Sequence, residues 1–132
     1  MTFCSNFPDI HKRLIDTFDP AGVCGVWDFG HSYLTNPDSA AVLAAFGNRI
    51  CGTHVHDNDR TGDHHWTPLT GTIDWKAEMA ALASGGYSGY LTMELVYEHL
   101  YKDPEALRTF VRTAYENICK LDGMLHNLHW SA

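Results

Sequence analysis

Short apolar runs alternate with amphipathic segments along the chain. Residues 7–18 place apolar side chains at helical spacing, with Pro8 at a position that suits the first turn of a helix. The apolar run 23–27 then stops at Asp28, which is typical of a buried parallel strand bounded by turn residues. The pattern predicts a helix, then a strand, then a loop that opens at Gly30.

The same alternation continues to about residue 121. Asp38 and Asp74 can each cap a helix, and both of these helices are ended by glycine. The remaining predicted elements are strands over residues 50–55 and 90–93 and a final helix over about residues 104–121. Alternating strands and helices predict an α/β fold with parallel strands joined by right-handed crossovers, in one domain over residues 1–132. The tail after residue 122 shows no clear period.

Charge and cysteine content limit the classes of partner and the location. The chain has 9 Lys+Arg against 16 Asp+Glu, a net charge of -7. This disfavours nucleic acid and anionic membranes, whose binding needs clustered basic residues. No apolar run approaches the ~20 residues of a membrane span, nothing resembles a signal peptide, and the four cysteines form no C-x-x-C pair. We expect a soluble cytoplasmic protein with free thiols and neither nucleic-acid nor membrane partners.

A candidate metal ligand stands at the end of each predicted strand: Asp28, His54 and Glu94. The carboxyl ends of parallel strands converge on one face, so we expect the three side chains to meet. Each alone has an ordinary explanation, as a cap, a hydrogen-bonded core histidine or a solvated strand end. Together, two carboxylates and one imidazole suit one divalent ion such as manganese, magnesium, cobalt or zinc. No organic cofactor is expected.

Further polar residues follow the second ligand. His56 lies on the same face of its strand as His54, and we give it a supporting role. Asp63, His64 and His65 come next, in the loop after that strand. They form either a polar surface loop or part of the site, and both interpretations stay open.

At these residues the sequence resembles the xylose isomerase-like TIM-barrel superfamily, which includes sugar phosphate isomerases and epimerases, ketose 3-epimerases and endonuclease IV. The matching stretches are residues 23–31, 53–59, 63–68, 71–75 and 86–94. The resemblance implies that the strands are the last three, strands 6–8, of an eight-stranded barrel. A complete barrel needs about 250 residues, so the 132-residue chain is expected to be a partial domain without the N-terminal strands.

The resemblance also implies roles for individual residues. Asp28, His54 and Glu94 match three of the family's four metal ligands, and the fourth, a glutamate that ends the preceding strand, has no counterpart. Glu94 is the candidate acid/base that moves a proton beside a sugar carbonyl through an enediolate, with His31 as a second catalytic candidate. Residues expected to contact a small sugar or sugar-phosphate substrate are His31, His56, Asp63 and His65.

Three functional classes remain open. The first is a divalent-metal sugar phosphate isomerase or epimerase that acts on a small sugar or polyol, with an activity that truncation of the barrel is expected to impair. The second is an endonuclease IV-like zinc phosphodiesterase for abasic DNA, because Asp63 and His65 match positions that bind additional zinc in that branch. The third is an inactive metal-binding fragment or subunit.

Two further expectations follow from the partial barrel and its loops. Unpaired sheet edges favour self-association or completion by the missing barrel half. Leu69 stands where many relatives have glycine, and a different turn is expected there.

Overall fold

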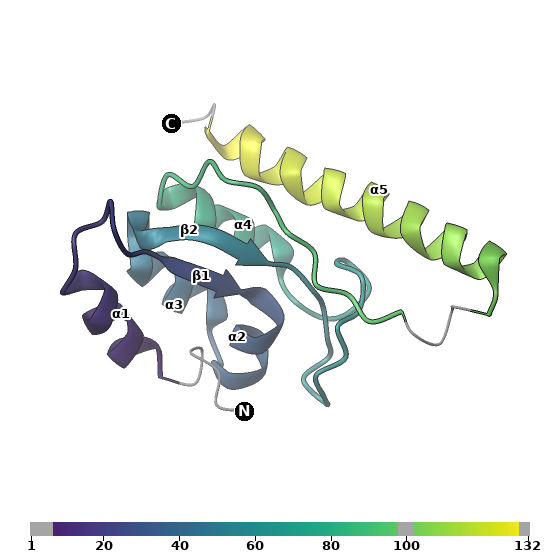
Figure 1. Ribbon diagram of the computed structural model, residues 1–132, viewed down its shortest axis with the longest axis horizontal. Coiled ribbons are helices and arrows are strands. Elements are labelled where there is room, and N and C mark those ends of the chain that lie inside the picture. Colours follow the sequence, from purple (N-terminus) through teal and green to yellow (C-terminus); the bar gives the residue numbers. More distant parts are fainter. Residues whose placement is uncertain (1–6, 98–101, 130–132) are drawn as a thin grey trace.

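Helices surround a two-stranded parallel sheet in the computed structural model, which describes residues 7–97 and 102–129. The elements in chain order are α1 (Pro8–Asp16), β1 (Gly25–Asp28), α2 (Phe29–Thr35), α3 (Ser39–Phe46), the 3-10 turn η2 (Gly47–Arg49), β2 (Ile50–His54), α4 (Trp75–Ser84) and α5 (Pro104–His129). Figure 1 shows α3 and α4 behind the sheet, with α1 and α5 on opposite sides of the body. The fold is α/β as predicted, and its described strands do not close into a barrel.

The two strands run parallel, and their last residues, Asp28 and His54, pair in register. A disulfide joins Cys24, just before β1, to Cys51 in β2. The prediction of free thiols is therefore wrong for this pair, whereas Cys119 is free and exposed. Residues 27 apart in sequence come within 5.9 Å between Cα atoms because parallel pairing aligns the two strands, which no local cysteine motif could reveal.

The third predicted strand, residues 90–93, is reduced to one parallel bridge between Val55 and Met93. The backbone N–H of Val55 donates to the carbonyl of Thr92 at 2.8 Å, and that of Glu94 donates to the carbonyl of Val55 at 3.1 Å. These two bonds are enough to fix the segment beside the end of β2. Glu94 therefore lies where the sequence predicted, although the strand before it does not form.

One aromatic pair joins the sheet to α3, and a second pair joins α2 to α4. Trp27 of β1 packs edge-on against Phe46 of α3, with ring centroids 5.6 Å apart. Phe29 packs on Trp75 of α4 at 5.3 Å. Each buried aromatic side chain removes about 150–250 Å² from water, so these pairs dominate the core beneath the candidate ligands.

Side-chain caps begin α3 and α4 as predicted. Asp38 accepts a hydrogen bond from the N–H of Ala41, and Asp74 accepts one from the N–H of Ala77, both at 3.1 Å. Each cap satisfies a backbone donor that the helix start leaves free. The two cap predictions are confirmed.

Two helices differ from the sequence-based expectations. The loop expected at Gly30 is the helix α2, because the carboxylate of Asp28 accepts the N–H of His31 and starts a helical turn. The last helix continues through the unassigned tail to His129. Leu121 and Leu125, one turn apart, are fully buried and hold this extension on the core. Among the described helices, we find no candidate membrane span.

The loop between β2 and α4 holds three non-glycine residues with positive φ: Arg60 at 69°, His65 at 50° and Leu69 at 68°. Glycine favours this region, and other residues enter it at a cost of about 1–2 kcal/mol. Leu69 thus adopts a conformation that glycine favours, and the different turn expected from the substitution stays a prediction.

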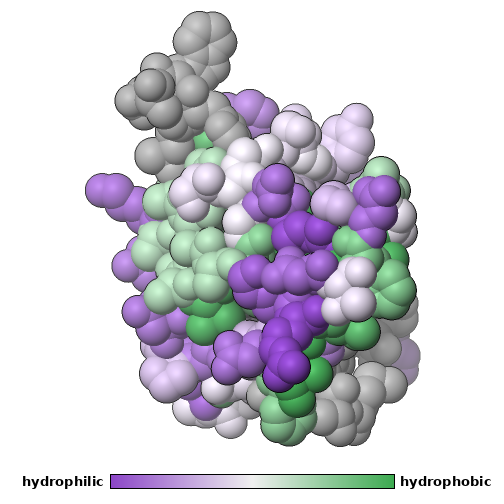
Figure 2. Space-filling view, turned by 90° about the vertical axis from the view of Figure 1, so that its left-hand side faces the viewer, coloured by the Kyte–Doolittle hydropathy of each residue, from purple (hydrophilic) through white to green (hydrophobic). Residues whose placement is uncertain are grey.

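An open hollow of about 540 Å³ lies between α1 and the sheet and reaches the candidate ligands. On α1, Ile15 is buried, but Ile10 and Leu14 are exposed. Figure 2 looks onto this side of the molecule and shows apolar patches interleaved with polar side chains. The segment after α1 is held by the buried Arg49, whose guanidinium donates to the carbonyls of Ile15 and Val23.

Glu78 is a buried carboxyl group between α3 and α4, and its Oε2 has no hydrogen-bond partner among the described residues. Burial raises the pKa of Glu78 from the usual 4.5 to about 7. A hydrogen bond with Ser39 opposes this rise in pKa, whereas the charges of Asp38 and Asp74 add to it. The folded protein therefore holds the Glu78 proton more tightly than the unfolded chain does.

This raised pKa predicts that Glu78→Gln stabilises the protein in a pH-dependent way. The favourable contribution of protonated Glu78 is complete below about pH 4.5 and is lost as the pH rises through about 7. Urea unfolding at pH 8 should show the variant more stable by about 2–3 kcal/mol, with no gain at pH 4.5. Glu116→Gln, at an exposed position of α5, is the control and should change neither value. A gain independent of pH would contradict this account of Glu78.

Candidate metal centre

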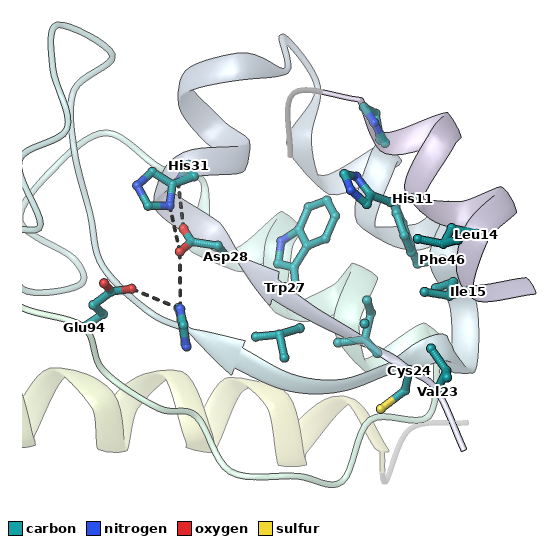
Figure 3. A pocket seen from close by; sticks show the side chains of 15 residues that line it. His11, Leu14, Ile15, Val23, Cys24, Trp27, Asp28, His31, Phe46 and Glu94 are labelled. Atoms are coloured by element: carbon teal, nitrogen blue, oxygen red, sulfur yellow. Dashed lines mark hydrogen bonds and ion pairs between the residues drawn. The ribbon is translucent and has the colours of Figure 1, made fainter. Parts of the chain in front are cut away.

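The three side chains predicted as ligands meet at the end of the hollow. The Nδ1 atom of His54 lies 3.0 Å from Oε2 of Glu94 and 3.6 Å from Oδ2 of Asp28. Figure 3 shows Asp28 and Glu94 near each other at one end of the hollow, and its dashed lines include the ion pairs that both make with His54. The side chains of His54 and Glu94 are 48% and 47% exposed, and that of Asp28 is 17% exposed. The group is thus open to solvent on one side.

Asp28 is held by donors on both of its oxygens. Its Oδ1 accepts the backbone N–H of His31 at 2.8 Å and lies 3.0 Å from Nε2 of His56. Its Oδ2 lies 2.8 Å from Nδ1 of His31. Burial alone would raise the pKa of Asp28, but the hydrogen bonds from His56 and the His31 backbone, with the charges of both imidazoles, bring it below its usual value. Asp28 is therefore ionised at neutral pH, as a metal ligand must be.

His31 stands between two carboxylates. Its Nδ1 faces Asp28, and its Nε2 lies 3.1 Å from Oδ2 of Asp63. Burial lowers the pKa of His31, but the charge of Asp28 and the hydrogen bond and charge of Asp63 outweigh burial and raise it. The imidazole thus links the strand end to the loop that follows β2.

A second group of possible ligands adjoins the first: His31, His56, Asp63 and His65, with one ligand atom from each lying within 4.8 Å of the others. Nε2 of His65 lies 3.2 Å from Oδ1 of Asp63, and the His65 ring stacks on that of His56. His64 turns away instead, stacking on Trp66 and pairing with Asp59. The adjacent histidines therefore face different surroundings, which the sequence did not distinguish.

The side-chain donors of Asp28, His54 and Glu94 are of the types that bind a divalent cation. Among the described residues, the ion-pair partners of Asp28 and Glu94 are all histidines, so no lysine or arginine neutralises the two carboxylates. Ligand atoms of Asp28, His56 and Glu94 lie within 4.8 Å of one another, so His56 as well as His54 lies near an ion that the two carboxylates would hold. His54 contacts the same two carboxylates from the exposed side, whereas His56 is completely buried.

Sequence reasoning missed two residues near this centre. His11 of α1 lines the hollow, and its Nδ1 is buried without a partner in the described part of the chain. Nothing in the amphipathic pattern distinguished it from a surface polar residue. Gly30 was assigned to a loop, but it packs directly against the ring of His56.

The open α/β unit, with candidate ligands at adjacent strand ends, is the arrangement expected for part of a TIM barrel, where functional residues lie at the carboxyl ends of the strands. The family described as xylose isomerase-like TIM barrel matches residues 1–116. The chain belongs to this family. The resemblance drawn from the strand-end motifs is therefore confirmed.

Two individual proteins are similar to this chain. An uncharacterized protein of Sinorhizobium fredii, y4fM, is 36% identical over 91 residues, which are 67% of this chain and 29% of that protein. The crystal structure of a D-tagatose 3-epimerase-like protein superposes with a TM-score of 0.58 and 21% identity, covering 84% of this chain and 43% of that one. The chain thus spans less than a third of the first protein and less than half of the second. The structural likeness confirms the fold, a part of a TIM barrel.

Proposed function

We propose that this chain carries most of the metal site of a sugar isomerase or epimerase, with Asp28, His54 and Glu94 as ligands of one divalent ion. The observation that carries the proposal is the convergence of these side chains around Nδ1 of His54, at 3.0 and 3.6 Å. Manganese, magnesium, cobalt and zinc all suit such a donor set. The D-tagatose 3-epimerase-like neighbour makes a small unphosphorylated ketose the first substrate to try, beside sugar phosphates and polyols.

The bound ion would polarise the carbonyl and hydroxyl oxygens of the sugar. The Glu94 carboxylate, half exposed toward the hollow, takes the proton from the carbon beside the carbonyl and returns it. His31, Asp63 and His65 bind the substrate hydroxyls from the loop side, and His31 also serves as a second proton-transfer group. Return of the proton to the opposite face or to the neighbouring carbon gives the epimer or the isomer.

The proton transfer is tested by deuterium incorporation. The chain with Mn²⁺ and a ketose in D₂O should introduce deuterium at the carbon beside the carbonyl, followed by NMR. Glu94→Gln removes the base and should lower the rate by about 100-fold or more. His64→Gln, which alters a loop imidazole outside both groups, is the matched control and should leave the rate unchanged. Exchange that is equally fast in Glu94→Gln would contradict the role of Glu94.

A second candidate is an endonuclease IV-like zinc phosphodiesterase for abasic DNA. The group of His31, His56, Asp63 and His65 favours it, because it offers donors for further zinc beside the first site. The net charge of -7 opposes it, because DNA binding depends on basic side chains. Incision of an abasic duplex in zinc buffer, lost in Asp63→Asn, would support this candidate, and the absence of any incision would dismiss it.

The third candidate is a metal-binding fragment or subunit that completes a barrel with another polypeptide. The exposed apolar side chains of α1 and the edge of β1 that no described residue pairs with support association with a second chain or with the rest of a barrel. Metal binding without deuterium exchange, followed by exchange once a polypeptide with the earlier barrel strands is added, would favour this role.

The cytoplasmic location expected from the sequence stays a proposal. The redox state of Cys24 and Cys51 in the cell tests it. Thiols of cytosolic proteins are mostly kept reduced. Cys24 and Cys51 should therefore be alkylated when cells are lysed in iodoacetamide. Protection of both would contradict a reducing location.

A further inference from the structure

His56 lies between the two groups of candidate ligands and reaches both. Its side chain is fully buried. Its Nε2 is 3.0 Å from Oδ1 of Asp28, while its ring stacks on His65 at a centroid distance of 3.9 Å and meets His31 edge-on at 5.0 Å. A side chain without exposed surface cannot touch a substrate in the hollow. We therefore do not propose the substrate contact that the sequence predicted for His56, and we consider a different role for this residue.

Gly30 provides the space that the His56 ring occupies. A Cβ atom at residue 30 would stand 2.0 Å from Cε1 and 2.2 Å from Nδ1 of His56. No side chain fits there while the imidazole stays in place. The carbonyl of Gly30 also accepts the side-chain amide of Asn58 at 3.0 Å, which fixes the backbone against the end of β2. Gly30 and His56 thus form a complementary pair at the start of α2.

The imidazole of His56 contacts one oxygen of Asp28, Oδ1, and leaves the other, Oδ2, facing His31 and His54. Oδ1 accepts the backbone N–H of His31 and lies within hydrogen-bond distance of Nε2 of His56, so both of its lone pairs are engaged. Oδ2 lies 2.8 Å from Nδ1 of His31 and 3.6 Å from Nδ1 of His54. Because Oδ1 is hydrogen-bonded on the buried side, the carboxylate cannot rotate freely about its Cβ–Cγ bond.

We propose that His56 is a positioning residue that locks the Asp28 carboxylate so that Oδ2 faces the ion, with Gly30 as the residue that admits its ring. The proposal rests on the metal centre proposed above. Partners of this kind, hydrogen-bonded to a ligand rather than to the ion, orient the ligand and tune affinity. Nε2 is the ring nitrogen that reaches Asp28, and Nδ1 of His56 has no partner among the described residues.

The test compares Mn²⁺ affinity and the Co²⁺ absorption spectrum in variants of the 132-residue chain. His56→Ala removes the donor and should weaken Mn²⁺ binding by about 10–100-fold. His56→Gln keeps an N–H donor and should recover most of the affinity with a spectrum like that of the parent. His64→Gln is the matched control and should match the parent in both measurements.

Gly30→Ala adds a second, independent comparison. Its Cβ displaces the ring, so it should weaken Mn²⁺ binding about as much as His56→Ala does. The double variant should be no weaker than His56→Ala alone, because the ring that the methyl group would strike is absent. Full additivity of the two losses would contradict the pairing of Gly30 with His56.

Three results would overturn the positioning role. The first is parent-like affinity in His56→Ala. The second is a His56→Gln variant as weak as His56→Ala, with a Co²⁺ spectrum that has lost a nitrogen ligand, which would make His56 itself a ligand. The third is a metal-free ¹⁵N NMR spectrum in which the proton of His56 lies on Nδ1 rather than Nε2. A parent chain that binds no metal would instead contradict the proposed function, and the metal-free spectrum would still decide the role of His56.

Discussion

Asp28→Asn is expected to reduce the affinity for Mn²⁺ by more than about 100-fold, because even the loss of an outer hydrogen-bond partner costs 10–100-fold. The asparagine oxygen can still accept the N–H of His31 and cap α2, so the fold should persist. What disappears is one of the two negative charges that face His54. Isothermal titration with Mn²⁺, beside a thermal unfolding curve of the same sample, measures both effects.

The matched control for this substitution is Asp59→Asn. Asp59 also pairs with a histidine, His64, at 3.3 Å, but it lies in the loop outside both ligand groups. Its variant should bind Mn²⁺ like the parent. Equal affinity in Asp28→Asn and the parent would exclude Asp28 as a ligand.

Removal of the disulfide is expected to cost about 3.5 kcal/mol of folding free energy. The bond between Cys24 and Cys51 spans 27 residues, and closing a loop of that length removes roughly this much entropy from the unfolded chain. The loop contains β1, α2 and α3, so the constraint acts on the sheet that carries Asp28. Urea unfolding of the oxidised and reduced protein measures the difference.

Two variants separate this effect from a general effect of the reductant. Cys24→Ser should be as unstable as the reduced parent and should not respond to dithiothreitol. Cys119→Ser, which removes the free and exposed thiol of α5, should keep the full difference between the two states. If reduction left the unfolding curve of the parent unchanged, the disulfide would contribute nothing to stability.

Local patterns in the sequence predicted the features that local chemistry determines. The caps at Asp38 and Asp74 were correct because a side-chain oxygen beside a helical run satisfies free backbone N–H groups wherever the helix packs. The ends of β1 and β2 were predicted to within one residue because apolar runs stop where the polar rim begins. The meeting of Asp28, His54 and Glu94 followed from parallel topology alone.

Features that depend on distant contacts could not be predicted in this way. The disulfide needs the register of two strands, and α5 passes Gly123 because buried leucines hold it on the core. The start of α2 depends on Asp28 acting as a cap while its other contacts fix its carboxylate. The burial of His56 depends on Gly30, because a side chain at residue 30 would occupy the space of the His56 ring. This close approach is apparent only in the three-dimensional structure.

The most direct test of the metal centre is anomalous diffraction at the zinc edge from crystals grown with zinc. The account predicts one peak about 2.0–2.2 Å from Oδ2 of Asp28, a nitrogen of His54 and a carboxylate oxygen of Glu94. A peak bound only by His31, Asp63 and His65, or no peak near Asp28, would contradict it.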